Sequence, residues 1–181
     1  MNNPPFPVIA TFDQHELELF DDADGEITWT RRAARAVLYN DKNQIAIMNF
    51  SILGSSKLPG GGIDDGEDII AALHREIEEE TGYRITDIKE LGVVEEDRYF
   101  CNMHQTSYCF TAKVAEFVGT SLTEDESRAG MNLRWADSIE EAVKWIESGT
   151  LTDEDGSKVG LAMMKIRDIA ILRAAATSRA L

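Results

Sequence analysis

The chain has 181 residues, of which 43% are hydrophobic and 28% charged, a composition typical of one globular domain with a sizeable core. Its formal net charge of −15 argues against nonspecific binding to nucleic acid or anionic membranes, because both need basic patches. No apolar run approaches the roughly 18–20 residues of a membrane-spanning helix, and residues 1–10 do not resemble a signal peptide. We therefore expect a cytoplasmic protein without nucleic-acid or membrane partners.

The first thirty residues are interpreted as an extension to the core. Three prolines within the first seven residues favour an extended arm. Short β-like runs at 7–12 and 26–30 flank a turn at 21–25, so we expect an N-terminal hairpin or extension over residues 1–30. Because such extensions can exchange between protomers, we also expect a homodimer.

The next segments predict a β-sheet. The runs at 33–39 and 44–50 flank Asn-Asp-Lys-Asn at 40–43, which is a hairpin pattern. Further strands are expected at 85–94 and at 107–118, the second being rich in aromatic and β-branched residues.

Two helices are expected in the last third of the chain. Residues 138–147 place their apolar side chains on one face, and Ser138 can cap the start. Residues 158–175 form a second helix whose apolar residues spread widely, either packing on the core alone or also facing a partner. Strands interleaved with helices indicate a sheet that is covered on both sides.

The two cysteines, Cys101 and Cys109, have no C-x-x-C spacing, and the residues after Cys101 offer no zinc pattern. A disulfide between them is an open alternative without support in the sequence. We expect two reduced thiols, as in a reducing compartment.

The segment from Gly61 to Tyr83 reads GGIDDGEDIIAALHREIEEETGY and is the most informative part of the chain. A helix here buries apolar residues at i, i+3 and i+7, namely Ile70, Leu73 and Ile77. Three carboxylates share another face, those of Glu76, Glu79 and Glu80. Like charges at this spacing destabilise a helix by roughly 0.2–0.5 kcal/mol per pair. A hard divalent cation offsets this repulsion, because it binds oxygen ligands and draws the carboxylates together. The expected ion is Mg²⁺, with Mn²⁺ as a substitute.

The flanking residues fit the same interpretation. Asp65 is the expected helix cap and Gly82 the expected left-handed stop. Arg75 lies four residues before Glu79 and can pair with that carboxylate. The turn at 58–62, Leu-Pro-Gly-Gly-Gly, lets backbone approach a ligand closely. A merely solvated acidic helix, the alternative, leaves the glycines unexplained.

The segment resembles the Nudix box, in which Gly-x5-Glu-x7 is followed by Arg-Glu-aliphatic-x-Glu-Glu-x-Gly-aliphatic. The matching residues are Gly61, Glu67, Arg75, Glu76, Ile77, Glu79, Glu80 and Gly82. Only Tyr83 departs, being aromatic where the family usually has an aliphatic residue. The resemblance implies an α/β fold, an α/β/α sandwich with a mixed β-sheet. It divides the chain into the extension at 1–30, a Nudix hydrolase domain at 31–156 and a C-terminal helix at 157–181 packed on that domain.

The resemblance also implies an activity, the Mg²⁺-dependent cleavage of the pyrophosphate linkage in a nucleoside diphosphate joined to another moiety X. Substrates of this class include nucleotide sugars, dinucleoside polyphosphates and nucleotides. The expected partner is therefore a small nucleotide substrate. The implied metal ligands are the carbonyl of Gly61 and the carboxylates of Glu76, Glu79 and Glu80.

Glu79 is the expected general base, with Arg75 and Glu67 in orienting roles. Within the family the base can instead lie in a downstream loop, where Glu124 and Glu126 are the candidates here. The alternatives are a non-catalytic Nudix-fold ligand-sensing module, an acidic interaction protein and an isomerase with a catalytic cysteine. The intact box favours hydrolysis over all three.

Substrate contacts are expected from cations near the box, namely Arg31, Arg32, Arg35, Lys57 and Arg98. Tyr99 lies sixteen residues after Tyr83, a position where some diadenosine polyphosphate hydrolases of the family carry a tyrosine. The proline that marks many ADP-ribose hydrolases near this place is absent, which counts modestly against ADP-ribose.

Overall fold

The structure, a computed structural model, describes residues 6–16, 25–149 and 157–179. Its strands are β1 (Val8–Asp13), β2 (Trp29–Tyr39), β3 (Ile45–Phe50), β4 (Ser55–Lys57), β5 (Gly60–Gly62), β6 (Tyr83–Arg98), β7 (Met103–Phe117) and β8 (Met131–Ala136). Its helices are α1 (Ile69–Thr81), α2 (Glu124–Arg128), α3 (Ile139–Glu147) and α4 (Ser157–Arg179), and Tyr99–Cys101 forms a 3₁₀ turn.

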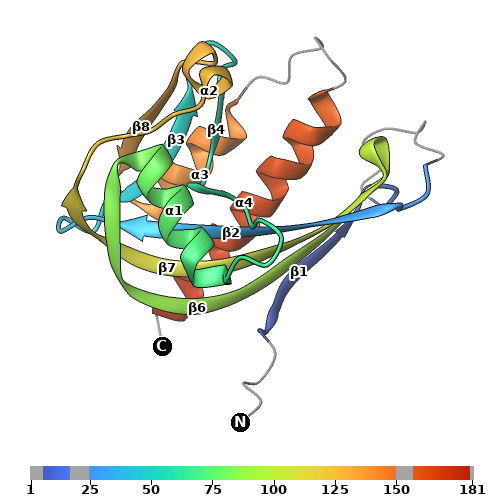
Figure 1. Cartoon of the computed structure of the whole chain (residues 1–181), viewed down its shortest axis with the longest axis horizontal. Coiled ribbons are helices and arrows are strands. Elements are labelled where there is room, and N and C mark those ends of the chain that lie inside the picture. Colours follow the sequence, from blue (N-terminus) through green and yellow to red (C-terminus); the bar gives the residue numbers. More distant parts are fainter. Residues whose placement is uncertain (1–5, 17–24, 150–156, 180–181) are drawn as a thin grey trace.

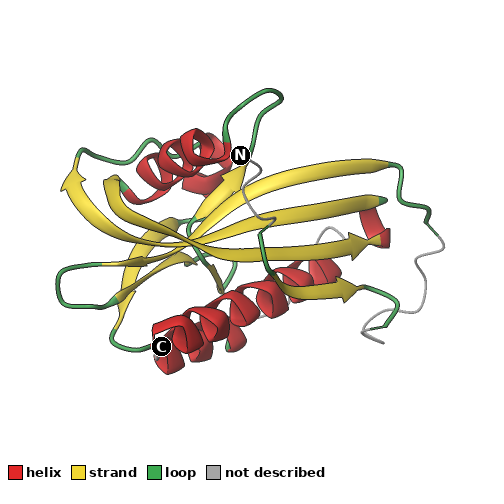
Figure 2. Cartoon of the chain, turned by 90° about the horizontal axis from the view of Figure 1, so that it is seen from below, coloured by secondary structure: helices red, strands yellow, loops and turns green. Residues whose placement is uncertain are grey.

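The strands form one eight-stranded sheet in the order β1-β6-β7-β2-β3-β4, with β5 paired to β2 and β8 paired to β3 (Figure 1). The pairs β1–β6 and β2–β7 are parallel, whereas β6–β7 and β2–β3 are antiparallel. Helix α1 covers one face of the sheet, and α3 and α4 cover the other (Figure 2). The predicted mixed sheet between helices is confirmed.

The side chains of β2 alternate between the two faces of the sheet and pack into a separate hydrophobic core on each face. Ala34, Ala36 and Leu38 pack with Leu73 and Ile77 of α1, while Val37 and Tyr39 pack beneath α3 and α4. The predicted burial of Ile70 is wrong, because this side chain at the start of α1 is exposed. The strand can supply both cores because successive side chains point to opposite faces. The same alternation sends the arginines of β2 to different sides of the sheet.

Helix α1 begins later in the chain than the acidic residues at 64–68 suggest. The N-cap is Asp68, whose carboxylate accepts the N–H groups of Ile70 and Ala71, so the predicted cap at Asp65 is wrong. The reason is that Asp64 and Glu67 close a separate turn, with a backbone bond of 3.0 Å, in which Gly66 has φ of 79° and keeps the chain out of the helix. The predicted left-handed end at Gly82, with φ of 76°, is confirmed.

Of the two forms predicted for the N-terminal segment, a hairpin or an extension, the hairpin is wrong. Strand β1 lies parallel to β6 at one edge of the sheet, and its apolar side chains pack on the core beneath α4. The predicted turn at 21–25 lies outside the described residues except for Gly25. The division of the chain at residues 30 and 156 stays a prediction.

At the other end of the chain, α4 packs on the sheet beside α3 and buries Ile171, Leu172 and Ala175 in that core (Figure 2). Among the described helices, none has the length and apolar character needed to cross a membrane. Both cysteines, Cys101 and the buried Cys109, are free thiols.

His104 on β7 gives the fold a pH-dependent contact. Its Nδ1 lies 2.6 Å from Asp97 and its Nε2 lies 3.0 Å from Glu95, both on β6. The hydrogen bond to Asp97 is the main cause of the raised pKa of His104, and the charge of Glu95 adds to it. Protonated His104 therefore stabilises the fold fully below about pH 6.5, and this stabilisation is lost as the pH rises through the folded pKa.

We accordingly expect His104→Gln to lower the free energy of unfolding at pH 5.5 and to have less effect at pH 8.5. The difference should be about 1 kcal/mol or less, because the half-exposed site is screened by solvent. Urea unfolding of both proteins across this pH range measures it. A cost that grows with pH would contradict the assignment.

Candidate active site

A pocket of about 340 Å³ opens between α1, the glycine turn and α2. Its lining residues are Arg31, Lys57, Gly61, Gly62, Arg75, Glu76, Glu79, Glu80, Thr123 and Glu126. The structure thus brings the box carboxylates together with three cations from β2, β4 and α1. We treat this pocket as the candidate active site.

The three glycines of the turn at 58–62 form β5, which pairs antiparallel with β2 directly beside the pocket. A Cβ atom on Gly61 would overlap the carboxylate of Glu76, so this carboxylate lies against the backbone of the turn. Gly60 has φ of 125° and packs on the backbone of Ala34 and Arg35. Gly60 therefore requires glycine, both for its positive φ and for its approach to the β2 backbone, whereas a side chain at Gly61 would displace the carboxylate of Glu76.

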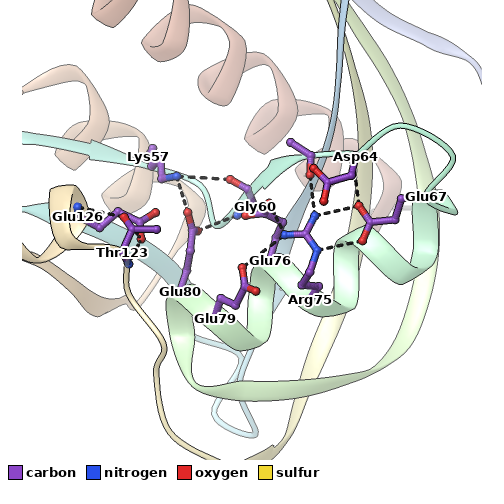
Figure 3. A network of polar contacts seen from close by, with 11 residues as sticks. Lys57, Gly60, Asp64, Glu67, Arg75, Glu76, Glu79, Glu80, Thr123 and Glu126 are labelled. Carbon is purple, nitrogen blue, oxygen red and sulfur yellow. Dashed lines mark hydrogen bonds and ion pairs between the residues drawn. The ribbon is translucent and has the colours of Figure 1, made fainter.

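Arg75 ties the carboxylates of the box together (Figure 3). It donates to both oxygens of Glu67 at 2.9 Å, to Glu76 at 2.8 Å and to Glu79 at 3.4 Å. A further bond of 3.0 Å reaches the carbonyl of Gly62. The predicted pairing of Arg75 with Glu79 is present. The same guanidinium holds the pKa of Glu67 down to about 2, so Glu67 is an anchor for Arg75 rather than a proton acceptor.

Glu80 faces a different partner. Its carboxylate is buried, with one oxygen 2.5 Å from the ammonium of Lys57 and the other accepting the N–H of Gly60 at 2.9 Å. Burial raises the pKa of Glu80, and Lys57 opposes that shift. In this arrangement Glu80 holds the turn and Lys57 in place, while Glu76 and Glu79 are held by Arg75 (Figure 3).

These pairings separate the carboxylates that the box places on one helix face. Across the three described ranges, no group of three acidic, His or Cys side chains is arranged to hold a metal ion. The donor chemistry nonetheless suits a hard divalent cation, because Glu76 lies against the Gly61 backbone and Glu79 is the neighbouring carboxylate of the same pocket. Glu76, Glu79 and the Gly61 carbonyl are the residues that fit such an ion, and Glu80 would join them on leaving Lys57.

The opposite wall of the pocket is the start of α2. Thr123 caps this helix, and the carboxylate of Glu126 accepts the backbone N–H and the hydroxyl of Thr123 at 2.8 and 2.9 Å. Glu126 therefore lines the pocket, whereas Glu124 pairs with Arg128 on the surface. The Thr-x-x-Glu capping-box pattern is the signal by which the sequence could also have indicated Thr123.

The other expected substrate residues lie elsewhere. Tyr99 follows the end of β6 that is distant from α1, where its hydroxyl bonds Asp13 at 3.3 Å and its ring packs on His15 (Figure 1). Arg98 is buried beneath α4 and bonds Glu96 at 2.6 Å. Neither lines the pocket.

The arginines of β2 take three different positions. Arg35 supports the glycine turn from behind, with a bond of 3.0 Å to the Gly60 carbonyl, and burial lowers its pKa to about 10. Arg32 is exposed and lies over the ring of Tyr108. Arg31 alone of the three lines the pocket. The sequence named it among several nearby cations, but only the register of β2 distinguishes it from its neighbours.

Comparison with known proteins identifies the family that this fold and site define. The family model of the NUDIX domain matches residues 29–156. The chain therefore belongs to the Nudix family, and the predicted family is confirmed.

Two solved structures share the fold at low identity. A Nudix hydrolase from Nitrosomonas europaea is 20% identical, with a TM-score of 0.54 over 74% of this chain and 88% of that one. A MutT protein from Methanosarcina mazei Go1 is 18% identical, with a TM-score of 0.55 over 86% and 98%.

One curated relative is similar in sequence. It is the CMP-5'-(N-acetyl-N-hydroxy-3-aminopropyl)phosphonate hydrolase of Streptomyces rubellomurinus, 30% identical over 142 residues. The match covers 71% of this chain but only 61% of the relative's length.

Proposed function

We propose that the protein is a Mg²⁺-dependent hydrolase that cleaves a phosphoanhydride linkage between a nucleotide and another group X. The observation that carries this proposal is the pocket in which Glu76 and Glu79 share Arg75 beside the Gly61 turn, facing Lys57 and Arg31. The name of the curated relative supports a nucleotide joined to X through a second phosphorus atom.

We assign the pocket residues three roles, which are holding the metal ion, orienting its ligands and binding phosphoryl oxygens. When bound, Mg²⁺ would neutralise phosphoryl charge and lower the pKa of the attacking water. Glu76, Glu79 and the Gly61 carbonyl would hold it, and Arg75 keeps the two carboxylates oriented. Lys57 and Arg31 face the space where phosphoryl oxygens would enter.

Hydrolysis needs one proton acceptor. Water attacks phosphorus and forms a new P–O bond while the bridging P–O bond breaks, and the bridging oxygen leaves with the second phosphorus-containing product. Glu79 is the residue that we assign this role, since its side chain is 45% exposed and its ion pair with Arg75 is long, at 3.4 Å. Its carboxylate has two oxygens, so that one would hold the ion while the other takes the proton of the water. Glu126 on the opposite wall is the alternative acceptor.

The substrate class is tested with a panel of ADP-ribose, other nucleotide sugars, dinucleoside polyphosphates, nucleoside triphosphates and a CMP-linked phosphonate. We expect cleavage of at least one member with Mg²⁺ and none after chelation. Because Tyr99 lies outside the pocket, we expect no special preference for diadenosine polyphosphates. Binding of Mg²⁺ without cleavage of any member would instead favour a ligand-sensing module.

We also propose that the protein acts in the cytoplasm as a homodimer. Its two free thiols support the first part, and the edge position of β1 offers a strand surface for the second. A monomeric mass in light scattering would contradict the dimer.

A further inference from the structure

The backbone of the glycine turn is held from two sides. On the side of α1, the carboxylate of Glu80 accepts the N–H of Gly60 at 2.9 Å. On the opposite side, the carboxylate of Asp168 in α4 accepts the N–H of Leu58, also at 2.9 Å. Arg35 of β2 donates to the Gly60 carbonyl at 3.0 Å. The C-terminal helix therefore binds the backbone of the turn directly.

The turn depends on these contacts because it has few constraints of its own. Pro59 has no N–H, so Leu58 and Gly60 supply the backbone donors at the entrance to the turn. The φ of Gly60, 125°, is one that no side chain helps to fix. Leu58 is fully buried, so removal of Asp168 would leave its N–H without this acceptor. The position of the turn is thus set from α1, β2 and α4.

Asp168 is itself held by a buried network between the sheet and α4. Its other oxygen accepts the Nε of Arg167 at 2.7 Å, and the guanidinium of Arg167 lies 3.9 Å from Glu96 of β6. These three side chains are at most 2% exposed. Burial and the charge of Arg167 lower the pKa of Arg35, and the charge of Asp168 opposes them. Asp168 therefore supports both contacts that reach the turn from this side.

The turn places two groups of the candidate active site. Lys57 directly precedes Leu58, and its ammonium lies 2.5 Å from the buried carboxylate of Glu80. Three residues after Leu58, Gly61 lies against the carboxylate of Glu76 and has a carbonyl that suits a hard divalent cation. A displacement of Leu58 would reach both groups through the backbone.

We propose that Asp168 is a positioning residue of the candidate active site, which holds the glycine turn so that the Gly61 carbonyl and the box carboxylates can bind one divalent cation. The inference rests on the metal site of the proposed function, but it is tested without hydrolysis. Helix α4 begins at Ser157, beyond the matched NUDIX domain. A residue outside the domain thus orders a site whose ligands lie within it.

The test is the affinity of the free protein for Mn²⁺, followed by the electron paramagnetic resonance signal of unbound Mn²⁺. We expect Asp168→Ala to weaken Mn²⁺ binding by at least about tenfold, the range for loss of a residue that orients a metal ligand. The matched control is Glu96→Gln, because Glu96 is buried in the same network and bonds Arg98 and Gln105 rather than the turn. It should bind Mn²⁺ like wild type.

A second variant separates the contact from the stability of the fold, since Asp168→Ala also breaks a buried ion pair. The double variant Arg167→Met/Asp168→Leu replaces that pair by apolar side chains, a change that is often neutral for stability. It too lacks the acceptor of the Leu58 N–H. We expect it to be folded by circular dichroism and to bind Mn²⁺ as weakly as Asp168→Ala.

Wild-type affinity for Mn²⁺ in the folded double variant would overturn the positioning role, and so would an equal loss of affinity in Glu96→Gln. Mn²⁺ binding that depends on Asp168, together with no hydrolysis of any panel substrate, would support the role while the proposed function fails. Mg²⁺-dependent hydrolysis by wild type, with Mn²⁺ affinity unchanged in both Asp168 variants, would do the reverse. Absence of Mn²⁺ binding to wild type would overturn both.

Discussion

Replacing Glu79 with glutamine is expected to lower kcat by at least about 10²-fold, the range for loss of a general base. The amide keeps the size of the side chain but cannot take a proton, and it removes one carboxylate from the pair that Arg75 orients. The fold should survive, because Glu79 is substantially exposed and its ion pair with Arg75 is long, at 3.4 Å. Steady-state kinetics on the best substrate of the panel, together with circular dichroism, measure both effects.

The matched control is Glu78→Gln. Glu78 is the preceding residue of α1, pairs with Arg84 at 3.4 Å on the surface and does not line the pocket. Its change should leave kcat within about twofold of wild type, since a lone surface pair contributes little. Full activity of Glu79→Gln would reject Glu79 as base, and a large loss in Glu126→Gln would then place the base on α2.

Removing the carboxylate of Asp168 is the largest expected effect on stability. Asp168→Ala takes away the partner of the buried Arg167 guanidinium and of the Leu58 N–H. Breaking a buried ion pair by removing one member typically costs about 3–5 kcal/mol. We expect a loss of about this size, because Arg167 would keep only Glu96, at 3.9 Å, among the described carboxylates, and the Leu58 N–H would lose its acceptor. Urea unfolding measures the loss, and activity should fall as well because Leu58 begins the glycine turn.

Asp125→Ala is the control for that experiment. Asp125 also pairs with an arginine, Arg128 at 3.1 Å, but both side chains are exposed on α2. Its removal should leave the unfolding midpoint unchanged. A similar midpoint for Asp168→Ala and wild type would show that the buried pair does not stabilise the fold.

Local sequence signals predict one side of the candidate site. The spacing within the box places Arg75 within reach of Glu79, and the run of glycines predicts the turn in which Gly60 has φ of 125°. Both depend on neighbours along one helix or on one turn. The predicted helix stop at Gly82 holds for the same reason.

Long-range pairing is what the sequence does not reveal. The ion pair of Lys57 with Glu80 spans 23 residues and depends on how β4 meets α1. The separation of Arg31 from Arg32 depends on the orientation of β2, which an isolated strand pattern leaves open. The parallel pairing of β1 with β6 has no turn signal in the sequence, which is why the hairpin alternative for the N-terminal segment is wrong while the extension alternative stays a prediction.

The most direct test of the proposed activity follows the best panel substrate in ¹⁸O-labelled water, with Mg²⁺ and with chelator, for wild type, Glu79→Gln and Glu78→Gln. We predict two phosphorus-containing products, one of them labelled, released only with metal by wild type and Glu78→Gln. Glu79→Gln should release almost none. Cleavage that persists after chelation, or that is equal in Glu79→Gln, would contradict a metal-dependent hydrolase centred on Glu79.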